Sequence, residues 1–307
     1  MRKRPLQNQN AEPSSSLVRV TDYALLLVLS LIWGLAFVAI RELDTQLGFI
    51  NLTLLRWLVA ATGYLVLLPF VGKAKVKFAK ADLPRLLVIG FLNVAVYHLA
   101  LNYGEITVSA GLAGLLITLG PVFSVLLAAA FLREKVGARL VLALALAMGG
   151  AAVLFAGDLP AGVAPWGPLA VVLAALSYAM FGLLSRPLVK KYGALHVAIW
   201  AGVVGTVMIL PLISASFVSD VSRLPLSGWE ALLYLSLLST VAGYSMFYTL
   251  VGRVGVSRLM IQLYLAPVVS VVGGVLLLGE TVSGYTLLGG GLMLLAVWLA
   301  TMRRKRA

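Results

Sequence analysis

Ten runs of about 20 predominantly apolar residues constrain this chain more than any other feature of its sequence. A helix of about 20 residues crosses the hydrocarbon core of a bilayer, and runs this long exceed the strands of a membrane barrel. The chain is 61% hydrophobic and 11% charged, which leaves too few charges to cover a soluble domain. We therefore predict an all-α membrane protein with ten transmembrane helices, near residues 23–40, 52–71, 83–102, 109–132, 139–156, 165–185, 194–214, 229–250, 257–278 and 285–302.

The basic residues predict how these helices are threaded. If the gaps between runs alternate between two sides, all but three of the 24 Lys and Arg fall on the side of the termini. Arg41 and Arg223 fall on the other side, and Arg56 lies within a span. Because cytoplasmic loops carry the excess of Lys and Arg, both termini are predicted to be cytoplasmic. Residues 1–22 lack the apolar core of a signal peptide and are predicted to form a cytoplasmic tail, as is the basic stretch 303–307.

One phrase occurs twice in the chain. GPVFSVLLAAAFLREKV at 120–136 and APVVSVVGGVLLLGETV at 266–282 share seven identical positions at an offset of 146 residues. We therefore predict two five-helix repeats, residues 23–157 and 165–302. Because five is odd, the second copy would enter the membrane from the opposite side. Such inverted repeats are typical of carriers that work by alternating access. A duplicated scaffold that moves no solute is the alternative.

The sequence resembles the EamA family of the drug/metabolite transporter superfamily. Trp33-Gly34, Arg56 and the segments 102–136 and 264–282 carry the resemblance, which extends from Tyr23 to Met302. It departs from the family pattern at Arg133, where Gly is usual, and at Tyr178, where Trp is usual. The resemblance implies a ten-helix solute carrier of a bacterial inner membrane, commonly an exporter of amino acids or related metabolites. Among its members, this chain resembles the aromatic amino-acid exporters most.

Polar and aromatic residues at membrane depth are candidates for a solute pocket. Equivalent positions of the two copies, 146 residues apart, pair His98 with Tyr244 and Asn102 with Tyr248. Within each copy the two residues are four apart and so lie on one helix face. Packing against lipid or other helices is the alternative for each. The predicted pocket residues are Trp33, Asn93, Tyr97, His98, Asn102, Thr118, Tyr178, Tyr244, Tyr248, Gln262 and Tyr264.

Proline and glycine within spans four and nine predict bent, mobile helices. Proline removes a backbone hydrogen bond, and glycine permits close approach. The predicted hinges are Pro121, Pro267, Gly120 and Gly273. The alternative is that both residue types are simply common in membrane helices.

Three charged residues allow two interpretations each. Arg56 either extends to the membrane surface, or pairs with Glu105 or a solute carboxylate. Glu134 and Glu280 follow helix ends, and we interpret them as caps for spans five and ten rather than as solute ligands. No Asp or Glu lies in the middle of a span, so the sequence shows no carboxylate relay for ion coupling.

These residues together predict an alternating-access transmembrane transporter that exports small neutral or zwitterionic metabolites, above all amino acids, including aromatic ones. Export of other drugs or metabolites is the alternative, followed by an intramembrane enzyme or a scaffold. The chain has no cysteine, two histidines and no nucleophile–base motif. We therefore predict no catalytic residues, metal or cofactor. The expected partners are the solute and the lipid bilayer, and not nucleic acid, because the placement of the positive residues explains the net charge of +13.

Overall fold

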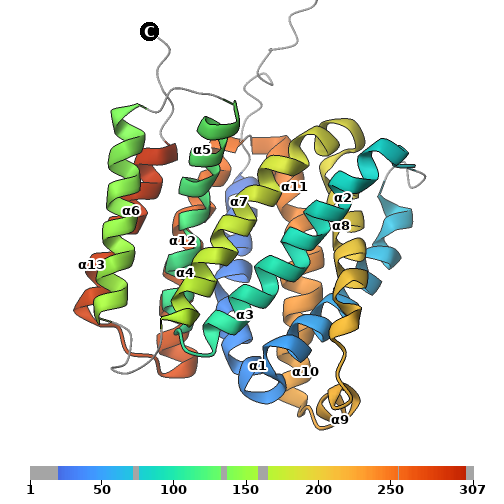
Figure 1. The fold of residues 1–307 in the computed structure, drawn as a ribbon. Coiled ribbons are helices and arrows are strands. Elements are labelled where there is room, and N and C mark those ends of the chain that lie inside the picture. The colour runs from blue at the N-terminus through green and yellow to red at the C-terminus, as the bar shows by residue number, and fades with distance from the viewer. Residues whose placement is uncertain (1–19, 72–75, 133–136, 158–164, 255, 302–307) are drawn as a thin grey trace, which may run out of the picture.

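Helices make up the architecture of this chain. The computed structural model describes residues 20–71, 76–132, 137–157, 165–254 and 256–301, and these ranges contain no β-strand. Figure 1 shows the helices side by side in one bundle. The α-helices are α1 (Val20–Leu67), α2 (Leu83–Gly90), α3 (Leu99–Glu105), α4 (Ala110–Ile117), α5 (Leu119–Leu132), α6 (Ala138–Gly157), α7 (Trp166–Tyr192), α8 (Ala194–Ile209), α9 (Phe217–Ser222), α10 (Leu226–Leu233), α11 (Gly243–Val254), α12 (Val256–Leu278) and α13 (Gly284–Thr301).

The lengths and surface of these helices are those of a multi-pass membrane protein. Within the described ranges, six helical stretches are long and apolar enough to cross a membrane, and three shorter helices are also apolar. Large apolar side chains cover the outside of the bundle: Phe131, Leu276 and Leu287 are 70%, 76% and 70% exposed. Water would penalise so much exposed apolar surface, whereas lipid accepts it.

The first long stretch, Val20–Phe70, is built differently from the prediction. Two helices separated by a loop were expected at 23–40 and 52–71, but α1 continues through the intervening residues and bends at Gly48, where φ is +70°. Glycine reaches this left-handed conformation without steric cost. The helical path before the bend is supported by side-chain bonds: Thr45 Oγ1 donates to the Glu42 carbonyl at 2.7 Å, and Gln46 Nε2 donates to Glu42 Oε1 at 2.9 Å.

Two spans contain π-helical turns that the sequence pattern does not reveal. Segment η3 (Phe91–His98) lies between α2 and α3, and η5 (Tyr234–Ala242) lies between α10 and α11. The repeat offset of 146 residues places the equivalent of η3 at residues 237–244, which overlaps η5. The two copies therefore contain π-helical turns at nearly equivalent positions. Wider π turns within α-helices frequently mark functional sites. The remaining short turns are the 3₁₀ segments η1 (Leu68–Phe70), η2 (Lys80–Asp82) and η4 (Leu210–Leu212).

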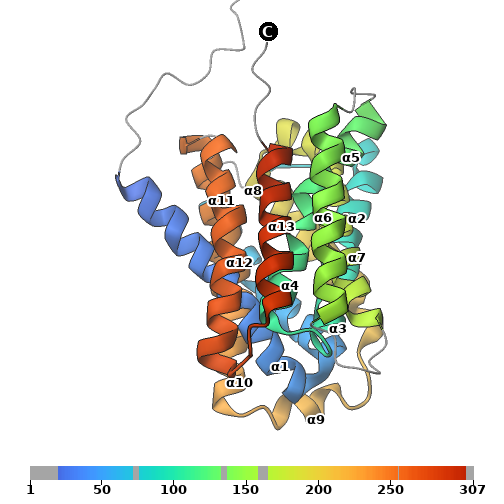
Figure 2. The same cartoon turned by 90° about the vertical axis from the view of Figure 1, so that its left-hand side faces the viewer.

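The helices of the two sequence copies pack against one another in matching pairs. Helix α12 lies beside α1 and α4, and α7 lies beside α4 and α5. Helices α6 and α13, the last of each copy, lie side by side and run in opposite directions in Figure 2. The first described residue of α1 and the last of α13 lie toward the same end of the bundle (Figure 2).

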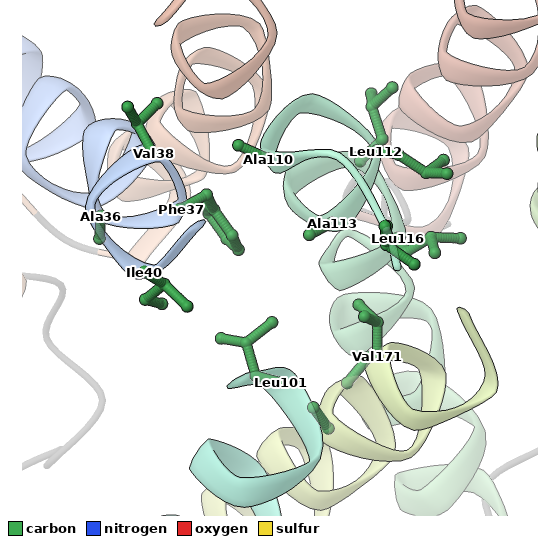
Figure 3. Close-up of a cluster of buried hydrophobic side chains, with 14 of the residues drawn as sticks. Ala36, Phe37, Val38, Ile40, Leu101, Ala110, Leu112, Ala113, Leu116 and Val171 are labelled. Atoms are coloured by element: carbon green, nitrogen blue, oxygen red, sulfur yellow. The ribbon is translucent and has the colours of Figure 1, made fainter. Parts of the chain in front are cut away.

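A large apolar cluster of buried side chains joins several helices of the bundle. Figure 3 shows its members converging from α1, α3, α4 and α7, with Ile40 of α1 facing Leu101 of α3. The cluster continues along α1 to Leu43 and Leu47 and reaches Leu232 of α10, all 6% exposed or less. Apolar packing therefore holds α1, α3, α4 and α7 together.

Candidate functional site

A cavity lies at the centre of the bundle, between helices of both sequence copies. Its empty volume is about 870 Å³, a figure that includes the part open to the surroundings. Typical small-molecule sites span about 300–1,000 Å³. The lining residues come from α1, η3, α3, α4, α5, α7, η5, α11 and α12: Trp33, Ala36, Phe37, Ile40, Arg56, Tyr97, His98, Leu101, Gly114, Ile117, Thr118, Pro121, Tyr178, Ser239, Tyr244, Ala266 and Pro267.

Aromatic rings form much of the cavity wall and lie in two groups. On one side, the ring centroid of Trp33 is 5.5 Å from that of Tyr244 and 5.5 Å from that of Phe247. On the other side, the centroid of Tyr97 is 4.7 Å from that of His98 and 6.1 Å from that of Tyr178. Offset and tilted rings at these separations attract one another and present flat apolar faces with a few polar atoms. Such a wall suits a solute with an apolar or aromatic body.

Hydrogen bonds and ring contacts hold individual wall residues in place. Trp33 Nε1 donates to the Ser239 carbonyl at 3.0 Å, which ties α1 to η5. His98 is 2% exposed, and neither ring nitrogen has a hydrogen-bond partner within the described part of the chain. Its ring lies against Trp57, at a centroid separation of 5.0 Å. His98 therefore brings two unused polar atoms to a largely apolar cavity.

The structure brings together six of the predicted pocket residues and both predicted hinge prolines. They are Trp33, Tyr97, His98, Thr118, Tyr178, Tyr244, Pro121 and Pro267. The helix of span four is interrupted at Thr118, between α4 and α5. This break lies three residues before Pro121, whose ring cannot donate the usual backbone hydrogen bond. In contrast, α12 runs through Pro267 as a continuous helix, so the two copies differ at equivalent prolines.

Two predicted pocket residues lie away from the central cavity. Asn93 borders a smaller hollow that it shares with Tyr64 and Tyr244. Asn102 is fully buried between α3 and α1, where its Nδ2 donates to Thr53 Oγ1 at 2.9 Å. The sequence criteria, a polar side chain at membrane depth, could not distinguish a residue that packs between helices, such as Asn102, from one that lines the cavity. The side chains of Tyr248, Gln262 and Tyr264 lie outside the described residues.

The two predicted hinge glycines lie in close helix contacts. A β-carbon at Gly120 would be 3.1 Å from Cδ1 of Tyr178, and one at Gly273 would be 2.9 Å from Cδ2 of Leu35. Gly120 thus leaves room for a ring of the cavity wall, and Gly273 allows α12 to approach α1. Close packing explains both glycines without requiring helix motion.

Arg56 and Ser239 line the cavity although neither was among the predicted pocket residues. Ser239 lies on the π-helical segment η5, and the sequence carried no signal for its place in the cavity wall. Arg56 did carry a signal, because a charged residue within a span is a functional candidate. It is 5% exposed and lines the cavity, so the first of its two interpretations, extension to the membrane surface, was wrong.

Glu280 caps a different helix from the one predicted. Its Oε1 accepts from the backbone N–H of Ala110 at 2.7 Å, and its Oε2 accepts from that of Gly111 at 3.2 Å. These N–H groups open α4, in the first copy, whereas the start of α13 is capped by Ser283, whose Oγ accepts from the N–H of Thr286 at 3.0 Å. A carboxylate stabilises a helix N-terminus, so Glu280 links the two copies. Glu134 lies outside the described residues.

Comparison with known proteins identifies the family of this chain. The EamA-like transporter family matches residues 21–156 and, a second time, residues 165–302. The chain belongs to this family. It is therefore a member of a family of membrane transporters, within the drug/metabolite transporter superfamily, as the sequence resemblance predicted.

Several relatives match over most of their length. An uncharacterized transporter of Archaeoglobus fulgidus is 32% identical over 89% of this chain and 95% of its own. A probable terminal-alkyne amino-acid exporter of Streptantibioticus cattleyicolor is 34% identical over 90% of this chain and 92% of its own. A probable amino-acid metabolite efflux pump of Escherichia coli is 27% identical over 91% of this chain and 94% of its own.

One solved crystal structure has a similar fold. It superposes with a TM-score of 0.61 and 18% sequence identity, covering 92% of this chain and 96% of its own. At this identity the likeness concerns the fold alone.

Proposed function

We propose that this transporter is an exporter of amino acids and related small metabolites, with a preference for solutes that have an apolar or aromatic body. The observation that carries the proposal is the central cavity, whose wall combines Trp33, Tyr97, His98, Tyr178 and Tyr244. Aromatic rings with polar edges bind amphipathic solutes. The names of two relatives, an amino-acid exporter and an amino-acid metabolite efflux pump, support both the solute class and the direction.

We further propose that the two copies are inverted five-helix repeats forming ten membrane passes, in a bacterial inner membrane, with both termini cytoplasmic. The packing supports this proposal. The first helix of the first copy, α1, packs against α12 of the second copy, and the first helix of the second copy, α7, packs against the equivalent α4 and α5 of the first. The opposite directions of α6 and α13 (Figure 2) fit the same relation. Counting Val20–Phe70 as two passes around Gly48, the long and short apolar helices add up to ten.

On this proposal, transport alternates between two packings of the repeats. In one the cavity opens to the cytoplasm, and in the other it opens to the outside. The apolar cluster shown in Figure 3 and the Glu280 cap on α4 would then separate and re-form in each cycle. The helix break beside Pro121 and the π-helical turns supply places where the helices can bend.

Purified protein in liposomes tests the proposed activity. Vesicles loaded with unlabelled phenylalanine are expected to take up labelled phenylalanine, tyrosine and leucine several-fold faster than protein-free vesicles, with little uptake of lysine. The part of the cavity wall that the structure describes has no acidic side chain to hold a second positive charge. Repeating the assay with a pH gradient determines whether protons drive net movement. Uptake of every amino acid at the rate of empty vesicles would contradict the proposed function.

A further inference from the structure

The central cavity contains one permanently charged side chain among its lining residues, Arg56 of α1. The residue is 5% exposed, so its guanidinium is almost fully removed from the surroundings. Arginine is rarely buried unless it is paired, because desolvating the charge is costly. The environment around Arg56 should therefore contain a counter-charge or a full set of acceptors.

The described part of the protein supplies only one acceptor. Arg56 Nη2 donates to Oγ1 of Thr240 at 3.2 Å, while Nε and Nη1 have no acceptor within the described residues. Glu105, the partner considered from the sequence, forms no ion pair with Arg56 within the described residues. Both carboxylate oxygens of Glu105 are themselves buried without a hydrogen-bond partner there.

The unused donors of Arg56 match a carboxylate. The guanidinium carries five N–H groups in a planar fork, and Nη2 has a second hydrogen beyond the one directed at Thr240. An edge of the fork therefore stays free for two parallel bonds to the oxygens of one anion. Because the described lining residues include no second permanent cation, a singly charged carboxylate fits the site better than a doubly charged phosphate.

We propose that Arg56 binds the carboxylate of the transported solute, while the aromatic walls hold its apolar body. This inference rests on the proposed function and adds the group by which the cavity recognises its solutes. The same charge repels cations that lack a carboxylate. The protein would therefore select amino acids and other monocarboxylates over the amphipathic amines that the aromatic wall alone would accept.

Binding of three related ligands to the purified protein tests the inference. L-Phenylalanine has a carboxylate and an amine, 3-phenylpropionate has the carboxylate alone, and L-phenylalaninamide has the amine alone. The wild-type protein is expected to bind the first two and to bind the amide at least tenfold more weakly. This comparison requires no variant, so it remains informative even if a substitution at Arg56 prevents folding.

Variants then assign the effect to Arg56. Arg56→Met is expected to weaken phenylalanine binding about 100-fold, the usual scale for removing one partner of a buried charged pair, and to leave amide binding within threefold. Arg56→Lys should lose less, because it keeps the charge but not the fork. Arg223→Met, at an exposed arginine after α9, is the matched control and should change neither affinity. Monodisperse elution of each variant confirms folding.

The outcomes separate this inference from the proposed function. Equal wild-type binding of phenylalanine and its amide, or an equal loss of both in Arg56→Met, would overturn the role of Arg56 even if amino acids are transported. Binding of 3-phenylpropionate without phenylalanine would support the carboxylate site and contradict amino-acid transport. Binding of neither carboxylate would overturn the inference.

Discussion

Gly34→Ala is expected to abolish solute exchange and to lower the thermal unfolding midpoint by about 5 °C or more, the scale of an overpacked helix contact. A β-carbon at Gly34 would lie 2.5 Å from Cβ of Val269 and 2.7 Å from the carbonyl oxygen of Ala266. Neither atom can move by changing a side-chain rotamer. Helix α12 must therefore shift away from α1, and it carries Ala266 and Pro267, which line the cavity. Liposome exchange and a thermal melt in detergent measure the two effects.

Gly182→Ala is the matched control for this change. Gly182 lies in the interior of α7, and a β-carbon there would meet nothing within 4 Å. Alanine favours a helix over glycine, so this variant is expected to be as stable as the wild type or slightly more stable, and to transport normally. Normal exchange by Gly34→Ala would show that the approach of α1 to α12 is not needed for transport.

Tyr178→Ala is expected to reduce exchange of phenylalanine about tenfold while changing exchange of alanine less than twofold. The Tyr178 ring lies between two others, 6.1 Å from the centroid of Tyr97 and 5.3 Å from that of Phe181. Removing it takes away part of the wall that would contact an aromatic solute, and one such contact is worth about 1 kcal/mol beyond the area it buries. Competition by both amino acids in one liposome preparation measures the ratio.

The choice of Tyr178 avoids a structural side effect. Trp33 also lines the cavity, but its Nε1 holds the Ser239 carbonyl, so its removal would disturb η5 as well as the wall. Tyr23→Ala, which removes a 45% exposed ring at the start of α1, is the control and should leave both rates unchanged. An equal fall in phenylalanine and alanine exchange in Tyr178→Ala would mean that the ring supports the fold rather than solute choice.

Membrane-helix content was predictable because its signal is spread over long stretches of sequence. Apolar runs identify helices through the physics of the bilayer, which leaves no unpaired backbone group. The bend at Gly48 was not predictable, because the residues around it form helix where a loop was expected. The π-helical turns η3 and η5 were also invisible, since a hydrogen bond to a carbonyl five residues earlier changes no side-chain type.

The candidate site was predictable where two copies of the chain repeat a chemical type. His98 and Tyr244 occupy equivalent positions and both line the cavity. Asn102, the equivalent of Tyr248, does not line the cavity, because its amide donates a hydrogen bond to Thr53 instead. That contact depends on how α3 packs against α1, which the repeat does not reveal. The prediction that Glu280 caps the next helix was wrong for a similar reason. A carboxylate can bind any helix N-terminus that is close in space, and Glu280 binds that of α4, which is distant in the sequence.

Labelling of single cysteines tests most directly whether two inverted repeats expose one cavity to both sides of the membrane. The chain contains no cysteine, so each introduced thiol is unique. Thr118, 5% exposed, lines the cavity, while Thr281 and Lys190 are exposed residues at the ends of α12 and α7. A membrane-impermeant thiol reagent is added from either side of oriented vesicles.

The account predicts that Thr281→Cys reacts only from outside, Lys190→Cys only from the cytoplasmic side, and Thr118→Cys from both. Phenylalanine should slow the reaction of Thr118→Cys and leave the other two unchanged. Reaction of Thr281→Cys from the cytoplasmic side and of Lys190→Cys from outside would mean that the second copy enters the membrane like the first, and would contradict the inverted repeats. Reaction of Thr118→Cys from one side only would contradict alternating access to the cavity.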